Sequence, residues 1–296
     1  MNTKWMKSQA FRKITHMMGS AAAVLGIGFV GIRIWDNSHS NSFPAITPLM
    51  VAMLLLLMVT YTIACQLHPL AWKCVLAQLG VRVPETWAIK AYGKTQLAKY
   101  LPGNVFHLAG RQVAGMSAGI PSAAVAKSIG VEMTMLIVSG GCFTVLLIPI
   151  VAPIVTPLVS LILFPCLATS VYLVIRSFVG INLSTSFLLQ IVFHLCSSLT
   201  FATVYLMLGG RVSDLNFVAA AYVIAWLIGT ITPGAPAGVG IRELVLIFIL
   251  GRHMEQAQLI SAVALGRAVT ISADVLFFII ATVIRTNFHI DRQEKA

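Results

Sequence analysis

The sequence has few charged residues and especially few acidic ones. Charged residues make up 10% of its 296 residues, and 9 Asp and Glu stand against 20 Lys and Arg. A soluble globular chain is about a quarter charged and close to half apolar. Apolar residues here make up 58%, and the mean hydropathy is +0.91. This composition excludes an ordinary soluble protein and predicts an integral membrane protein.

The chain also lacks any stretch long and polar enough to form a soluble domain. We therefore expect one polytopic membrane domain over residues 1–296, with short cytoplasmic segments at 1–15 and 285–296. The net charge of +11 is not arranged as a basic patch interleaved with aromatic residues, so we expect no nucleic-acid partner. The positive charge instead fits the positive-inside rule and attraction to anionic lipid headgroups.

Cysteine pairs and catalytic motifs are missing as well. The five cysteines are odd in number and show no CxxC or Cys/His metal spacing, so we expect no disulfide framework, no metal and no cofactor. No GxSxG, HExxH, P-loop or DxD pattern occurs. We assign no catalytic residue and expect a protein that is not an enzyme. A membrane-embedded transferase that uses Glu132 or Asp274 as its acid stays open as an alternative.

What the sequence has in abundance is apolar runs, and a run of about 20 residues can cross a bilayer as a helix. Basic residues gather in the connections on one side of these runs, which predicts a multi-pass protein of the bacterial inner membrane with both termini in the cytoplasm. The six runs of sufficient length are 16–35, 47–70, 128–150, 153–175, 184–208 and 257–284.

Two further regions, 84–126 and 215–251, do not read as simple spans. Each contains Pro-Gly, seven residues and then Arg: PGNVFHLAGR at 102–111 and PGAPAGVGIR at 233–242. Because three full spans lie between them, the second copy would enter from the opposite side. We predict an all-α membrane fold of about six spans plus two re-entrant helical hairpins in an inverted repeat. The residues expected to shape the two breaks are Pro102, Gly103, Pro233, Gly234, Gly238 and Gly240.

Charged residues within or beside the apolar runs are the candidate binding site. Each costs about 3 kcal/mol or more at the bilayer centre, so those that occur are usually paired or functional. Arginine suits a phosphate headgroup because its guanidinium donates two parallel hydrogen bonds. The candidate substrate-binding residues are Arg111, Arg242 and Arg267, the acids Glu132, Glu243 and Asp274 that would pair with them and couple movement to protons, and the flanking Lys99 and Tyr100.

A structural role for these charges is the alternative. Arg267 and Asp274 are too far apart along one helix for a close pair, so each needs a partner elsewhere. Arg267–Glu243 or Arg242–Asp274 would then be ion pairs that hold the helices together. The two roles are compatible if an acid holds an arginine until substrate displaces it. Asn104, just after the first Pro-Gly, would bond either the broken backbone or a ligand.

Three stretches in order, KYLPGNVFHLAGR (99–111), KSIGVEM (127–133) and TPGAPAGVGIRE (232–243), resemble the membrane region of the lysylphosphatidylglycerol synthetase/flippase family. The resemblance covers roughly residues 10–285. It implies an all-helical fold with re-entrant segments that moves phospholipids or other lipid-linked species between leaflets. The motif positions of the family fall on Lys99, Tyr100, Pro102, Gly103, Arg111, Glu132, Pro233, Gly234, Gly238, Gly240, Arg242 and Glu243.

The chain departs from this family in two ways. It carries no synthase domain after the membrane region, so it resembles a stand-alone form, and Ala235-Pro236-Ala237 occupies a turn expected to be richer in Gly. We expect translocation of an anionic phospholipid or lipid-linked saccharide, with glycosyltransferases or lipid-modifying enzymes as possible partners. The alternatives are a membrane enzyme of lipid or polyprenyl-phosphate metabolism and a non-transporting subunit of an envelope-glycan assembly machine.

Overall fold

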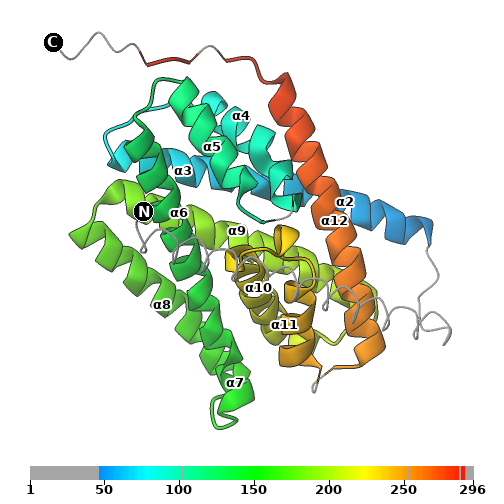
Figure 1. Cartoon of the computed structure of the whole chain (residues 1–296). Coiled ribbons are helices and arrows are strands. Elements are labelled where there is room, and N and C mark those ends of the chain that lie inside the picture. The colour runs from blue at the N-terminus through cyan, green and yellow to red at the C-terminus, as the bar shows by residue number, and fades with distance from the viewer. Residues whose placement is uncertain (1–46, 102, 252–253, 287, 291–296) are drawn as a thin grey trace, which may run out of the picture.

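The computed structural model describes residues 47–101, 103–251, 254–286 and 288–290, and every regular element among them is a helix (Figure 1). The predicted span 16–35 and the segment 1–15 lie outside the described residues, as does Pro102. The predicted tail 285–296 is described only in part.

Six of the described helical segments have the length and hydropathy to cross a membrane, which makes this a multi-pass membrane protein. Five of them match predicted spans. The sixth lies in the second irregular region, so the prediction that 215–251 enters and leaves on one side stays a prediction. The six segments are Pro48–Gln78, Ser122–Val151, Pro157–Phe178, Ile181–Met207, Val212–Ile231 and Gln258–Val283.

The first described segment is longer than predicted. Thr47 caps α2 (Pro48–Cys65) by accepting a hydrogen bond from the Met50 N–H at 3.2 Å. The backbone at Gln66 keeps helical angles, and α3 (Leu67–Gln78) continues the helix. The helix thus continues beyond residue 70, where the predicted span ends, and residues of this extension are buried in the protein, with Trp72 fully buried.

The predicted start of the next span, at residue 128, was also late. Pro121 precedes α6 (Ser122–Gly141), and the Ala-rich segment that follows favours helix from Ser122 onward. A 3-10 segment, η2 (Cys142–Leu147), and the short α7 (Ile148–Val151) extend α6 to its far end.

The centre of the bundle is α9 (Ile181–Met207), which packs against α2, α3, α6, α8, α10 and α12. Its partner α8 (Pro157–Phe178) is the least buried of the six spanning segments, and most of its side chains point away from the protein. The long α12 (Gln256–Val283) runs down one side of the bundle past both irregular regions (Figure 1).

Each irregular region forms two helices that pack on each other with a break between them. In the first helix pair, α4 (Glu85–Gln96) and the 3-10 segment η1 (Leu97–Tyr100) precede the break, and α5 (Phe106–Ser117) follows it. In the second helix pair, η3 (Val212–Asp214) leads into α10 (Leu215–Ile231), which precedes the break. The break contains η4 (Pro236–Gly238), and α11 (Ile241–Leu250) follows the break. Figure 1 shows α4 and α5 in the upper half of the molecule and α10 and α11 in the lower half.

Candidate functional site

The two breaks touch each other. The N–H of Gly234 donates a hydrogen bond to the carbonyl of Gly103 at 3.3 Å, although the two residues lie in different helix pairs. The glycines at the breaks adopt positive φ angles, 118° at Gly103 and 91° at Gly234, which other residues rarely take. The repeated Pro-Gly pattern therefore marks two loops that meet.

Asn104 fastens this contact. Its side-chain amide donates to the carbonyls of Gly229, Thr230 and Thr232 at 3.3, 3.0 and 3.4 Å. These carbonyls lie at and just after the carboxyl end of α10, where backbone carbonyls lack a partner within the helix. Of the two roles open for Asn104, the structure shows the first, since it bonds broken backbone, and that backbone belongs to the other helix pair.

Asn104→Gly is expected to loosen this contact by about 1–2 kcal/mol, because it removes the three hydrogen bonds. Glycine keeps the positive φ of 54° at this position without strain. Hydrogen exchange of the α10 carboxyl end should then become faster, while exchange in α9 stays unchanged. Equal exchange in wild type and variant would show that Asn104 does not hold the two pairs together.

Arg111 and Glu132 form a buried ion pair between α5 and α6. Both side chains are 1% exposed. The Arg111 guanidinium also lies 4.3 Å from the ring centroid of Tyr92 and 5.6 Å from that of Trp72. Arg111 is thus held by a carboxylate and by two aromatic faces.

Arg267 of α12 pairs with Glu243 of α11 at 2.6 Å and also donates to the Ala237 carbonyl in the second break at 3.3 Å. The predicted pair Arg267–Glu243 is therefore confirmed. It ties α12 to the second helix pair. Ala237 itself has a φ of 48°, so the turn predicted to need more Gly does contain a left-handed residue.

Asp274 of α12 bonds the first helix pair instead. It accepts from Lys99 at 2.7 Å, from the Tyr100 hydroxyl at 2.6 Å and from the Gln96 amide at 2.8 Å. The alternative pair Arg242–Asp274 was wrong, because Asp274 faces η1 and its oxygens are already occupied there. The prediction that Arg267 and Asp274 find separate partners is confirmed.

Arg242 differs from the other charged residues of the site. It is 8% exposed and makes no ion pair or side-chain hydrogen bond within the described part of the chain. Its guanidinium lies 5.3 Å from the ring centroid of Trp226. Together with Arg267 and Glu243 it lines a void of ≈ 10 Å³, but the Glu243 carboxylate pairs with Arg267.

Arg242 also lines a cavity of ≈ 40 Å³ beneath the touching breaks. Cavities of this size hold a few water molecules but no lipid headgroup. The polar residues of its wall come from both helix pairs and from α3, and no acidic residue is among them. They are His68, Tyr92, Gln96, Lys99, Asn104, His107, Thr230 and Arg242.

The structure therefore places most of the predicted site residues around the two breaks. Only some of them line the cavity. Lys99 and Arg242 line the cavity, while Arg267, Glu243, Tyr100 and Asp274 surround it through the pairs described above. Arg111 and Glu132 lie outside the cavity wall.

Sequence reasoning overlooked Gln96 and His68 as part of this site. Gln96, Lys99 and Tyr100 share one helical face at spacings of three and four residues, and this was the available signal for Gln96. His68 lies in a long apolar run and carried no such signal. Within the described residues, no group of three His, Cys, Asp or Glu side chains is placed to hold a metal ion.

Comparison of the chain with protein-family models gives no match, and comparison with curated proteins gives none. The resemblance carried by the three motifs stays a prediction.

Proposed function

We propose that this protein moves an anionic phospholipid or a lipid-linked saccharide across the bacterial inner membrane. The phosphate-bearing headgroup passes through the polar cavity between the two helix pairs, while the apolar tails stay in the lipid. Both termini lie in the cytoplasm. The motif resemblance to the lysylphosphatidylglycerol synthetase/flippase family agrees with this proposal.

The observation that carries the proposal is the unpaired, buried guanidinium of Arg242. A buried charge without a counter-ion costs several kcal/mol, and a site that keeps one gains this energy back when an anion arrives. Lys99 lines the same cavity and Arg267 the adjoining void. The guanidiniums of Arg242 and Arg267 and the single carboxylate of Glu243 leave an excess of positive charge. The negative charge of a phosphodiester would balance it.

The meeting of the two breaks supports a re-entrant, inverted arrangement. The first helix pair lies in the upper half of Figure 1 and the second in the lower half, and their breaks touch through Gly103 and Gly234. Transporters built from inverted repeats place their binding site at such a junction. The small cavity then corresponds to a closed state, and the headgroup enters when the Asn104 contacts open.

The ion pairs of α12 supply a second element of this mechanism. Asp274 holds the first helix pair through Lys99, and Glu243 of the second pair holds α12 through Arg267. A headgroup phosphate competes with these carboxylates for the same cations. Displacing one pair frees one helix pair to move relative to α12, which links binding to opening.

The test is a leaflet-resolved assay in sealed proteoliposomes with labelled anionic phospholipids and polyprenyl-phosphate sugars. We expect Arg242→Ala to lower the rate of headgroup movement at least about tenfold, as loss of one charge-assisted contact predicts. Arg176→Ala is the matched control, because Arg176 is an exposed arginine on α8 whose only described side-chain bond is to Tyr172.

Movement of lipid by Arg242→Ala at the wild-type rate would contradict the proposed role of the cavity. Chemical alteration of a lipid, without movement between leaflets, would favour a membrane enzyme instead. If no lipid of the panel moves or changes, a non-transporting subunit becomes the better reading.

A further inference from the structure

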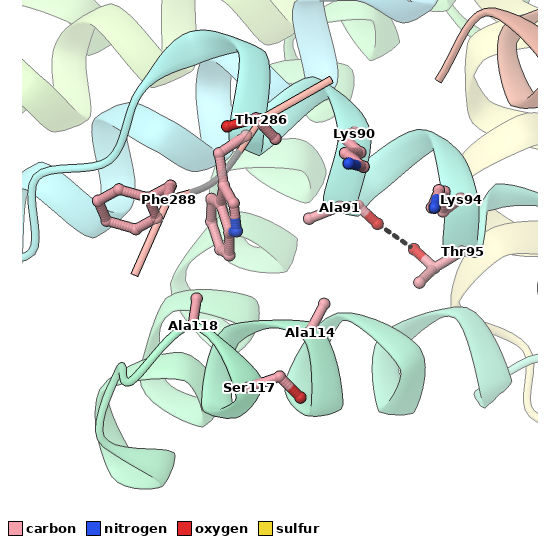
Figure 2. A pocket seen from close by; sticks show the side chains of 10 residues that line it. Lys90, Ala91, Lys94, Thr95, Ala114, Ser117, Ala118, Thr286 and Phe288 are labelled. Atoms are coloured by element: carbon pink, nitrogen blue, oxygen red, sulfur yellow. Dashed lines mark hydrogen bonds between the residues drawn. The ribbon is translucent and has the colours of Figure 1, made fainter. Parts of the chain in front are cut away.

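A second and larger pocket, of ≈ 270 Å³, lies at the other end of the first helix pair, between α4, α5 and the segment that follows α12 (Figure 2). None of its lining residues belongs to the cavity beneath the breaks. In Figure 2, Lys90 and Lys94 lie on α4, across from Ala114 and Ser117 on α5.

Thr286 and Phe288, which follow α12, complete this pocket. The Ile290 N–H donates to the carbonyl of Ala118 at 2.8 Å, which fixes the segment across the end of α5. Phe288 meets Trp87 edge to face with ring centroids 5.5 Å apart. The space itself exists because the facing residues of α4 and α5 are small, with Ala91 opposite Ala114. Three parts of the chain that are distant in sequence thus build one pocket.

The pocket has a positive rim and an aromatic wall. Lys90 and Lys94 are one helical turn apart, and neither forms an ion pair with a residue that the structure describes. Among the residues that the structure describes, no acidic side chain lines the pocket. Ser117 and Thr286 contribute hydroxyls that make no side-chain hydrogen bond in the described part of the chain, and Trp87 and Phe288 form the apolar side.

We infer that this pocket binds the phosphate group of an anionic phospholipid at the membrane surface. Two unpaired ammonium groups and free hydroxyls match a phosphodiester, and the aromatic wall matches the apolar glycerol and first acyl carbons attached to it. A lipid bound in this pocket would be the one that next enters the cavity beneath the breaks, and this role in transport rests on the proposed function. The binding itself does not.

Free phosphate shares the charge of a headgroup but lacks its apolar part. The two sources are separated by titrating the detergent-purified full chain with dihexanoyl phosphatidylglycerol, with inorganic phosphate and with dihexanoyl phosphatidylcholine. We expect the anionic lipid to bind at least about tenfold more tightly than either of the others, because surface lysines favour net negative charge and aromatic contact adds to it.

The double variant Lys90→Gln/Lys94→Gln is expected to weaken binding of the anionic lipid about tenfold or more. Arg82→Gln/Lys127→Gln removes the same charge from two exposed residues outside the pocket and should change binding less than about twofold. Ala114→Phe keeps every charge and fills the space, so it should also abolish binding. Each variant is checked for folding by its elution volume in size-exclusion chromatography and its circular dichroism spectrum, both of which should equal those of the wild type.

Three outcomes would overturn the inference. Equal weakening by both double variants, or undiminished binding by Ala114→Phe, would mean general surface attraction and no built site. Inorganic phosphate bound as tightly as the lipid would mean a phosphate site. Because the titration needs no leaflets, it separates this inference from the proposed function: Arg242→Ala should bind the lipid normally at this pocket while moving it at least about tenfold more slowly.

Discussion

Replacing Glu132 with alanine is expected to remove about 3–5 kcal/mol from the free energy of unfolding, because it leaves the Arg111 guanidinium charged, buried and without its counter-ion. Only 1% of either side chain is exposed, so water cannot take the place of the carboxylate. The measurement is unfolding by SDS titration in mixed micelles, followed by circular dichroism. Glu85→Ala is the matched control, because Glu85 pairs with Lys73 at 3.8 Å on the surface and should cost less than about 1 kcal/mol.

Removing both charges separates stability from function at this pair. Arg111→Met with Glu132→Leu should recover most of the lost stability, since apolar residues of similar volume commonly replace a buried ion pair without cost. Transport by this variant then tests the predicted headgroup role of Arg111. A stable variant that moves no lipid would support that role, whereas wild-type transport would leave Arg111 as a structural residue. Failure of the double change to recover stability would contradict the ion-pair explanation.

The membrane class and most spans follow from the sequence because a run of about 20 apolar residues commonly forms a membrane-spanning helix. The boundaries were less accurate where protein replaces lipid around a helix. At α3 the buried face continues past the apolar run, and only the fold shows which neighbours bury Trp72. The sequence of α10 was also ambiguous, because its 17 residues fit either a membrane span or the first helix of a re-entrant hairpin.

The charged residues of the site were identifiable because charges are costly in an apolar chain, but their partners were not. The spacing of Arg267 and Asp274 correctly required separate partners, since seven residues place them two turns apart. Choosing those partners needs long-range contacts, such as Lys99 with Asp274, that no local pattern encodes. For the same reason, the sequence did not reveal that Arg242, unlike Arg111 and Arg267, forms no ion pair within the described residues.

The repeated Pro-Gly pattern located the two loops but not their contact. Asn104 belongs to no periodic pattern of polar residues that would mark it as a contact residue. The three carbonyls that accept its hydrogen bonds lie more than a hundred residues away in the sequence. Backbone carbonyls carry no sequence signature. The position of the loops was therefore predictable, whereas the way they hold each other was not.

Gly238→Ala is expected to destabilise the second helix pair by about 3 kcal/mol, because it combines steric overlap with backbone strain. A methyl group at Gly238 would lie 2.7–2.9 Å from backbone atoms of Gly229, and backbone of α10 cannot rotate away as a side chain does. The φ of 69° adds the ordinary cost of a left-handed alanine.

Gly80→Ala isolates the two causes. Its φ of 79° is nearly the same, yet a methyl group there would meet nothing within 4 Å. It should therefore lose only about 1 kcal/mol in the same SDS titration, from backbone strain alone. Gly238 and Gly229 together let the break approach α10 closely enough to seat Arg242 against Trp226, so Gly238→Ala should also impair headgroup movement. If the two alanine variants were equally stable, the close approach of the second break to α10 would not be what positions Arg242.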